Sequence, residues 1–120
     1  MSEVSPLVHE SVSSNLEAQL EGAKQLVERR EIALRLYGNA DFRKLILEGF
    51  CLHDCAQFAQ NSSDPSLGEK ERADALAMSQ AAGHLRRFLS MTAQMGYVAQ
   101  HDIPKIEDAI LQARAEEDLD

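Results

Sequence analysis

The sequence is short of the residues that interrupt helices and of those that build sheets. Of its 120 residues only three are Pro and six are Gly, none is Trp, and aromatic residues make up 5%. Its apolar content comes mainly from Leu, Ala, Ile, Val and Met. Because β-branched and aromatic residues are few, this composition favours helices over strands. We therefore expect an all-α protein.

Long apolar runs and an excess of basic residues are missing too. No stretch of about 18 apolar residues occurs, so a membrane is not an expected partner. Residues 1–14 have neither a basic start nor an apolar segment, and a secretion signal is not expected. The net charge of −8 argues against a general nucleic-acid-binding protein, because neutralising phosphates requires an excess of Lys and Arg.

Cysteine is scarce as well, and the two present, Cys51 and Cys55, lie four residues apart. On one helix face their Cβ vectors run parallel, which is a poor geometry for a disulfide, so we expect reduced thiols in a cytoplasmic setting. With His53 and Asp54 they form the densest cluster of potential metal ligands. Zinc takes about four ligands, and His53 points to another side of the helix. Two buried thiols that pack like Ala are the simpler interpretation, and no metal or other cofactor is expected.

Helix start and stop signals divide the chain. Capping boxes at Ser14–Glu17 and Ser66–Glu69 begin helices, and Gly38-Asn39 ends one. Pro104 suits the first turn of a last helix, although one long helix kinked at Pro104 is the alternative. We predict a flexible N-terminal arm at 1–13, a single helical domain at 14–114 and an acidic tail at 115–120. Its helices are expected at about 14–37, 41–60, 66–100 and 102–115, as an antiparallel bundle of three main helices plus a short C-terminal helix.

Apolar residues recur at alternating steps of four and three, the spacing of a coiled-coil seam. The first predicted helix has this seam at Leu16, Leu20, Ala23, Val27, Arg30, Leu34 and Tyr37. The third has it at Ala73, Ala77, Ala81, His84, Phe88, Met91, Met95 and Val98. Gly83 and Gly96 weaken this third helix by about 1 kcal/mol each relative to Ala, so each is expected to mark a close approach or a bend.

The second predicted helix is apolar on two sides, which is typical of an interior or interface helix. One face contains Phe42, Leu45, Gly49, Leu52, Ala56 and Ala59, and the other contains Leu47, Phe50 and Phe58. From these helices we select eight residues for packing or interface roles: Leu45, Phe50, Leu52, Phe58, His84, Phe88, Met91 and Met95. His84 is interpreted as a core or interface histidine, which would make a symmetric interface sensitive to acid.

Catalytic chemistry is not indicated by any motif. The sequence has no nucleophile–base pair, no G-x-S-x-G and no glycine-rich phosphate loop, so we expect no catalytic residues and no enzyme. Three basic pairs, Arg29-Arg30, Arg43-Lys44 and Arg86-Arg87, could contact phosphate. The start of the third helix is acidic, however, and salt bridges with neighbouring carboxylates are the simpler role.

A longer pattern runs from Ala33 to about Leu89. The residues that carry it are Leu34, Leu36, Asn39, the runs 41–46 and 48–50, Asp64-Pro65, Leu67 and the run 83–89. This segment resembles a type of small helical protein encoded in tailed-bacteriophage genomes, often near capsid and portal genes. The resemblance implies an accessory or structural protein of the virion or its assembly, located in the host cytoplasm or the virion, and it brings no catalytic residues. Residues 51–55 depart from the pattern, where acidic residues and Ala are more usual.

Three functional hypotheses follow. The first is a non-enzymatic structural or assembly protein that forms homo-oligomers or docks on a larger phage structural protein, because its apolar stripes exceed what a short bundle hides. The alternative is an acidic helical regulator that binds and inhibits a host protein, as the net charge and the acidic tail indicate. A DNA-binding module for packaging or regulation is less favoured.

Overall fold

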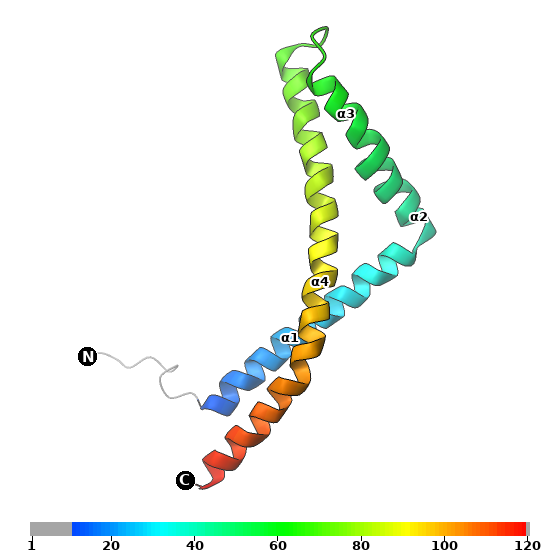
Figure 1. The fold of residues 1–120 in the computed structure, drawn as a ribbon. Helices are drawn as coiled ribbons and strands as arrows, with labels where there is room; N and C mark the ends of the chain where they lie inside the picture. Colours follow the sequence, from blue (N-terminus) through cyan, green and yellow to red (C-terminus); the bar gives the residue numbers. More distant parts are fainter. Residues whose placement is uncertain (1–10, 120) are drawn as a thin grey trace, which may run out of the picture. The chain divides into compact units, whose positions relative to one another are not determined.

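A computed structural model describes residues 11–119 of the chain, and within this range it contains helices and no strands. The all-α prediction is therefore confirmed. The elements are α1 (Val12–Gly38), α2 (Ala40–Phe42), the π-helix η2 (Arg43–Asp54), α3 (Cys55–Ser62) and α4 (Glu69–Leu119), which Figure 1 shows in sequence order. The predicted N-terminal arm falls mainly on residues 1–10, which lie outside the described residues.

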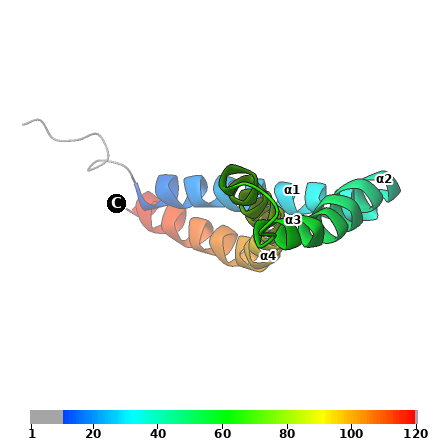
Figure 2. The same ribbon diagram turned by 90° about the horizontal axis from the view of Figure 1, so that it is seen from above.

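Two compact units make up the chain, and α1 and α4 contribute residues to both. The terminal unit consists of Met1–Arg30 and Gln94–Asp120, and the central unit consists of Glu31–Ala93. In the terminal unit the first part of α1 and the last part of α4 lie side by side in both views (Figures 1 and 2). A hydrogen bond from Ser13, near the start of α1, to Glu117, near the end of α4, shows that the two segments are antiparallel.

Helix α4 passes through Pro104 without a break. The expected division into helices at 66–100 and 102–115 is therefore absent, and the residues assigned to a short C-terminal helix form the last part of α4. A proline inside a helix has no N–H to donate to the carbonyl four residues earlier. The helix continues because apolar residues on both sides of Pro104 pack inward: Ile103 and Ile106 are half-buried, and Ile110 is buried.

Small residues form most of the interior. Five of the seven buried positions of α4 are separated by seven or fourteen residues, the repeat of a coiled-coil seam: Ala75, Ala82, Leu89, Gly96 and Ile110. The other two are Ala99 and Ala113. The buried positions of α1 are Ser13, Ala23 and Ala33. Leu89 and Ile110 are the two large aliphatic side chains that are buried among the described residues. Large apolar side chains are usually the most buried class, so an interior made mainly of Ala is unusual.

The predicted seam of α1 follows the inner face for most of its length. Leu16, Leu20, Val27 and Arg30 are half-buried and Ala23 is buried. At the next step the inner position shifts by one residue, because Leu34 is 46% exposed and Ala33 is 3% exposed.

The predicted seam of α4 lies on the exposed side of the helix. Ala81, Phe88 and Met95 are exposed, whereas their neighbours Ala82, Leu89 and Gly96 are buried. Two stripes with the same spacing therefore run along α4, one residue apart. The stripe of mostly smaller side chains packs inside, and the stripe with Phe and Met faces outward.

The second predicted helix also differs from expectation, because its central part is a π-helix. Hydrogen bonds from residue i to i+5 place residues four or five apart on one face, rather than three or four apart. The inner face of η2 and its neighbours therefore contains Phe42, Ile46, Cys51 and Cys55, which are half-buried or buried. Leu45 and Leu52, assigned to the packed face by α-helical spacing, are 70% and 55% exposed.

Candidate functional site

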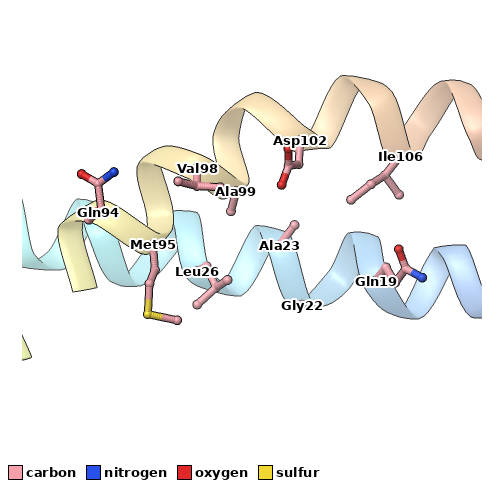
Figure 3. Close-up of a pocket in the computed structure, with 10 residues that line it drawn as sticks. All are labelled: Gln19, Gly22, Ala23, Leu26, Gln94, Met95, Val98, Ala99, Asp102 and Ile106. Carbon is pink, nitrogen blue, oxygen red and sulfur yellow. The ribbon is translucent and has the colours of Figure 1, made fainter. Parts of the chain in front are cut away.

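An apolar groove lies between α1 and α4 within the terminal unit (Figure 3). It has a volume of about 720 Å³. Its lining residues are Gln19, Gly22, Ala23, Leu26, Gln94, Met95, Val98, Ala99, Asp102 and Ile106. The size is in the range of ligand-binding clefts, and the lining has few polar groups. We regard this groove as the candidate functional site.

The groove has a floor of small residues and a rim of larger ones. In Figure 3, Ala23 points from α1 toward α4, and Ala99 points from α4 toward α1. A Cβ atom added to Gly22 would meet nothing within 4 Å, so the groove is open above this residue. Met95 and Val98 on the rim are 47% and 49% exposed. An apolar side chain entering the groove would therefore meet a smooth floor and gain contact with both rim residues.

A close helix crossing holds one end of the groove. A Cβ atom at Gly96 would lie 2.6 Å from the carbonyl oxygen of Leu26 and closer still to the Cβ atom of Arg30. The residue at position 96 must therefore be glycine for α1 and α4 to approach this closely. Nearby, the guanidinium of Arg30 lies 5.4 Å from the ring centre of Tyr97, a cation–π distance.

Polar contacts hold the other end. The backbone N–H and the hydroxyl of Ser13 donate hydrogen bonds to the carboxylate of Glu117, the shorter at 2.8 Å. Arg114 also pairs with Glu17. Because the hydrogen bonds from Ser13 stabilise the charged carboxylate, they lower the pKa of Glu117. Specific contacts thus fix the spacing of α1 and α4 at both ends of the groove.

None of the eight residues selected from the sequence is buried. Phe50 and Phe58 are half-buried, and Leu45, Leu52, His84, Phe88, Met91 and Met95 are exposed. Met95 lines the groove, whereas the other seven belong to the central unit. Sequence reasoning missed the floor residues Gly22 and Ala99. In the sequence these two positions are recognisable as small residues beside an apolar seam. That pattern identifies a groove floor only when the partner helix is known.

Two of the selected residues line smaller cavities in the central unit. Phe58 and Leu67 line one of about 350 Å³ together with Met78 from α4. Leu52 lines another of about 270 Å³, which Tyr37 and Arg86 also border. Each of these two cavities is smaller than the groove.

The two cysteines lie in the central unit as free thiols. Cys51 is 3% exposed, and this burial raises the pKa of its thiol, while Arg86 acts in the opposite direction. The Sγ atom of Cys55 lies 3.6 Å from the carbonyl oxygen of Ser79 on α4. Within residues 11–119, no three or more His, Cys, Asp or Glu side chains are grouped so that they could hold a metal ion. The same residues include no helix that is long and apolar enough to cross a membrane.

The lining of the groove is mainly apolar and suits binding by contact of apolar surfaces. Asp102 is the one titratable side chain among its lining residues, and no nucleophile accompanies it there. An apolar, preformed groove between two helices is the kind of surface that takes the apolar face of a third helix. Comparison with known proteins adds no family: no family model, curated protein or solved structure matches the chain.

Proposed function

We propose that the chain is a non-enzymatic structural or assembly protein that associates with further copies of itself through the groove of the terminal unit. The supporting observation is the groove itself, with its floor of Gly22, Ala23 and Ala99 and its half-exposed rim at Met95 and Val98. Small floor residues let another helix approach closely, and the rim residues gain burial when it does.

The chain carries a helical surface that suits this groove. In the central unit Ala77, Ala81, His84, Phe88 and Met91 of α4 are all exposed and are spaced by four and three residues. This spacing is that of an amphipathic helix that lies in an apolar groove. The charges match as well, because exposed Arg87 precedes Phe88 while Asp102 lines the groove. A second copy therefore supplies the partner surface without any further protein.

The proposal also covers the arrangement of helices in the oligomer and the assembly of a virion as its biological setting. Docking of the α4 stripe of one copy on the groove of another would build a local bundle of three helices from two copies. The resemblance of residues 33–89 to small helical phage proteins extends the proposal to virion assembly, with a larger phage structural protein as an additional partner. Mass spectrometry of purified virions tests this setting, since an assembly protein that stays in the particle is recovered from it.

Single charge substitutions test the proposed contact. Val98→Glu places a carboxylate in the groove, which is unfavourable opposite an apolar helix. We expect sedimentation and light scattering to show oligomers of the wild type at micromolar concentration, and dissociation of the variant with unchanged circular dichroism. Leu111→Glu is the matched control, because Leu111 is 65% exposed in the same unit and does not line the groove. A wild type that is monomeric at these concentrations contradicts the proposal.

Complementation identifies the two halves of the contact. Phe88→Glu damages the stripe and leaves the groove intact, whereas Val98→Glu does the reverse. Each variant alone is expected to be monomeric, and an equimolar mixture is expected to form dimers through the one undamaged groove and the one undamaged stripe. If the mixture stays monomeric, the stripe is not the occupant of the groove. A host protein recovered in stoichiometric amount by the monomeric protein would instead favour the acidic inhibitor.

A further inference from the structure

A small cavity in the central unit brings together three of its helices. Its volume is about 270 Å³, and its lining residues are Tyr37 of α1, Leu47 and Leu52 of η2, and Arg86 and Ser90 of α4. This volume is just below the usual lower limit for ligand-binding cavities, about 300 Å³, so an occupant must be small. None of the lining residues within 11–119 is acidic, and Arg86 gives the cavity a positive charge.

The π-helical spacing of η2 places two leucines on this cavity. Leu47 and Leu52 are five residues apart, the hydrogen-bond spacing of a π-helix, so they share a face of η2. In an α-helix with 3.6 residues per turn, residues five apart point in different directions. On α4, Arg86 and Ser90 are four residues apart and share a face of an ordinary α-helix. Because Leu52 is 55% exposed, an apolar occupant buries surface that the chain leaves in solvent.

Arg86 supplies charge and hydrogen-bond donors to the cavity without a carboxylate partner. Within the described part of the chain no Asp or Glu forms an ion pair with it, so the salt bridge expected for the Arg86-Arg87 pair is not found there. Burial raises the pKa of the Cys51 thiol and the Arg86 guanidinium opposes this rise, which places its charge near η2. Arg86 is also exposed, so a ligand can reach it. An accessible guanidinium beside two leucines suits an anion with an apolar body.

We propose that this cavity binds a small carboxylate with an apolar body, such as a short-chain fatty acid. The carboxylate accepts two parallel hydrogen bonds from the planar guanidinium of Arg86, which matches it in shape. Tyr37 and Ser90 each have a hydroxyl group that can donate a further hydrogen bond. The apolar body lies against Leu47 and Leu52. A phosphate monoester fits less well, because its charge of about −1.5 to −2 at pH 7 exceeds the single positive charge of Arg86.

Hexanoate is the probe, and acetate and 1-hexanol are matched ligands that lack its apolar body and its charge, respectively. NMR titrations that follow the methyl groups of Leu47 and Leu52 locate binding at this cavity. They use the Val98→Glu variant, in which a carboxylate at position 98 besides Asp102 makes the groove repel anions. We expect a dissociation constant on the order of 1 mM for hexanoate, as suits a ligand with few non-hydrogen atoms. Acetate and 1-hexanol should each bind about tenfold more weakly or worse.

Two neighbouring arginines provide the matched variants. Arg86→Gln removes the charge of the cavity, whereas Arg87→Gln removes the same charge one residue away, outside the lining. We expect Arg86→Gln to weaken hexanoate binding by about tenfold or more and Arg87→Gln to leave it unchanged, both with unchanged circular dichroism because both side chains are exposed.

Equal losses in the two variants would overturn the proposal, since attraction to net charge alone would then explain binding. Acetate that binds as tightly as hexanoate, or methyl signals of Leu47 and Leu52 that do not shift, would also overturn it. The Val98→Glu background is monomeric whether or not the wild type self-associates, so the result is independent of the proposed function.

Discussion

At the scale of single residues, Phe88 and Leu89 are neighbours in sequence with opposite surroundings. Leu89 is 6% exposed and Phe88 is 53% exposed. Leu89→Ala is expected to lower the free energy of unfolding by about 2–5 kcal/mol, because it leaves a cavity. Phe88→Ala is expected to cost less than Leu89→Ala, because about half of Phe88 already lies in solvent.

Urea unfolding in the monomeric Val98→Glu background measures both values without a contribution from association. Comparison of the two losses in free energy of unfolding decides which stripe of α4 is internal. Equal losses, or a larger loss for Phe88→Ala, would mean that the stripe selected from the sequence is the packed one after all.

Gly96 and Gly83 have different surroundings. Gly96 lies where α1 and α4 cross closely, whereas a Cβ atom at Gly83 would meet nothing within 4 Å. Gly96→Ala is expected to destabilise the protein by about 1–3 kcal/mol, because the added methyl group meets Leu26 and Arg30. In the monomeric Val98→Glu background, Gly22→Ala, also in the terminal unit and with open space around it, should be neutral or stabilising by up to about 1 kcal/mol. Chemical denaturation of both variants checks the pair, and similar stabilities would contradict the close crossing.

The sequence predicted a close approach or bend at both Gly83 and Gly96, because glycine alone does not show which face a partner helix occupies.

At the scale of elements, Pro104 is the least favourable residue of α4 for helix continuity. A proline inside a helix costs about 3 kcal/mol relative to Ala, because a hydrogen bond is lost and the ring crowds the preceding turn. Pro104→Ala is therefore expected to raise the melting temperature, with a gain of up to about 3 kcal/mol in the free energy of unfolding. Differential scanning calorimetry measures both. A lower melting temperature would mean that the proline positions Ile106 and Ile110 against α1 better than a regular helix does.

The helices were more predictable than the faces they bury. Capping signals and Gly38-Asn39 located the ends of α1 to within two residues, and seam spacing identified its inner face as far as Arg30. In α4 the same spacing fits two stripes, and choosing the one with larger apolar residues selected the exposed side. In η2 the period itself changes, so Leu45 and Leu52 could not be placed from α-helical spacing. Pattern reasoning assumes one period and large residues inside, and these two elements satisfy neither assumption.

At the scale of the whole molecule, Ser13 and Glu117 join residues 104 positions apart near the two ends of the described chain. The hydrogen bonds lower the pKa of Glu117 below its ordinary value of 4.5. A carboxyl group whose pKa is depressed on folding contributes stability above its unfolded pKa, and this contribution is lost as the pH falls through the folded pKa. We therefore expect the contact to be intact at neutral pH and to weaken progressively below pH 4.5.

Amide hydrogen exchange at Ser13 and Ser14, compared between pH 6 and pH 3 after correction for intrinsic rates, measures this loss. Glu117→Gln keeps a hydrogen-bond acceptor and removes the titrating group, so its corrected protection should be lower at pH 6 and should vary less with pH. Protection that falls equally with pH in both proteins would assign the acid sensitivity to other carboxylates.

Ala and Gly predominate among the buried residues between α1 and α4 in the terminal unit, and this affects how easily one helix can slide along the other. Side chains this short make shallow ridges, so little interlocking resists movement of one helix along the other. The register of the pair is then decided at its two ends: by the Gly96 crossing at one, and by the Ser13–Glu117 hydrogen bonds and the Arg114–Glu17 ion pair at the other. Each end acts as a stop. Loosening either stop would let the helices shift lengthwise while their secondary structure stays intact.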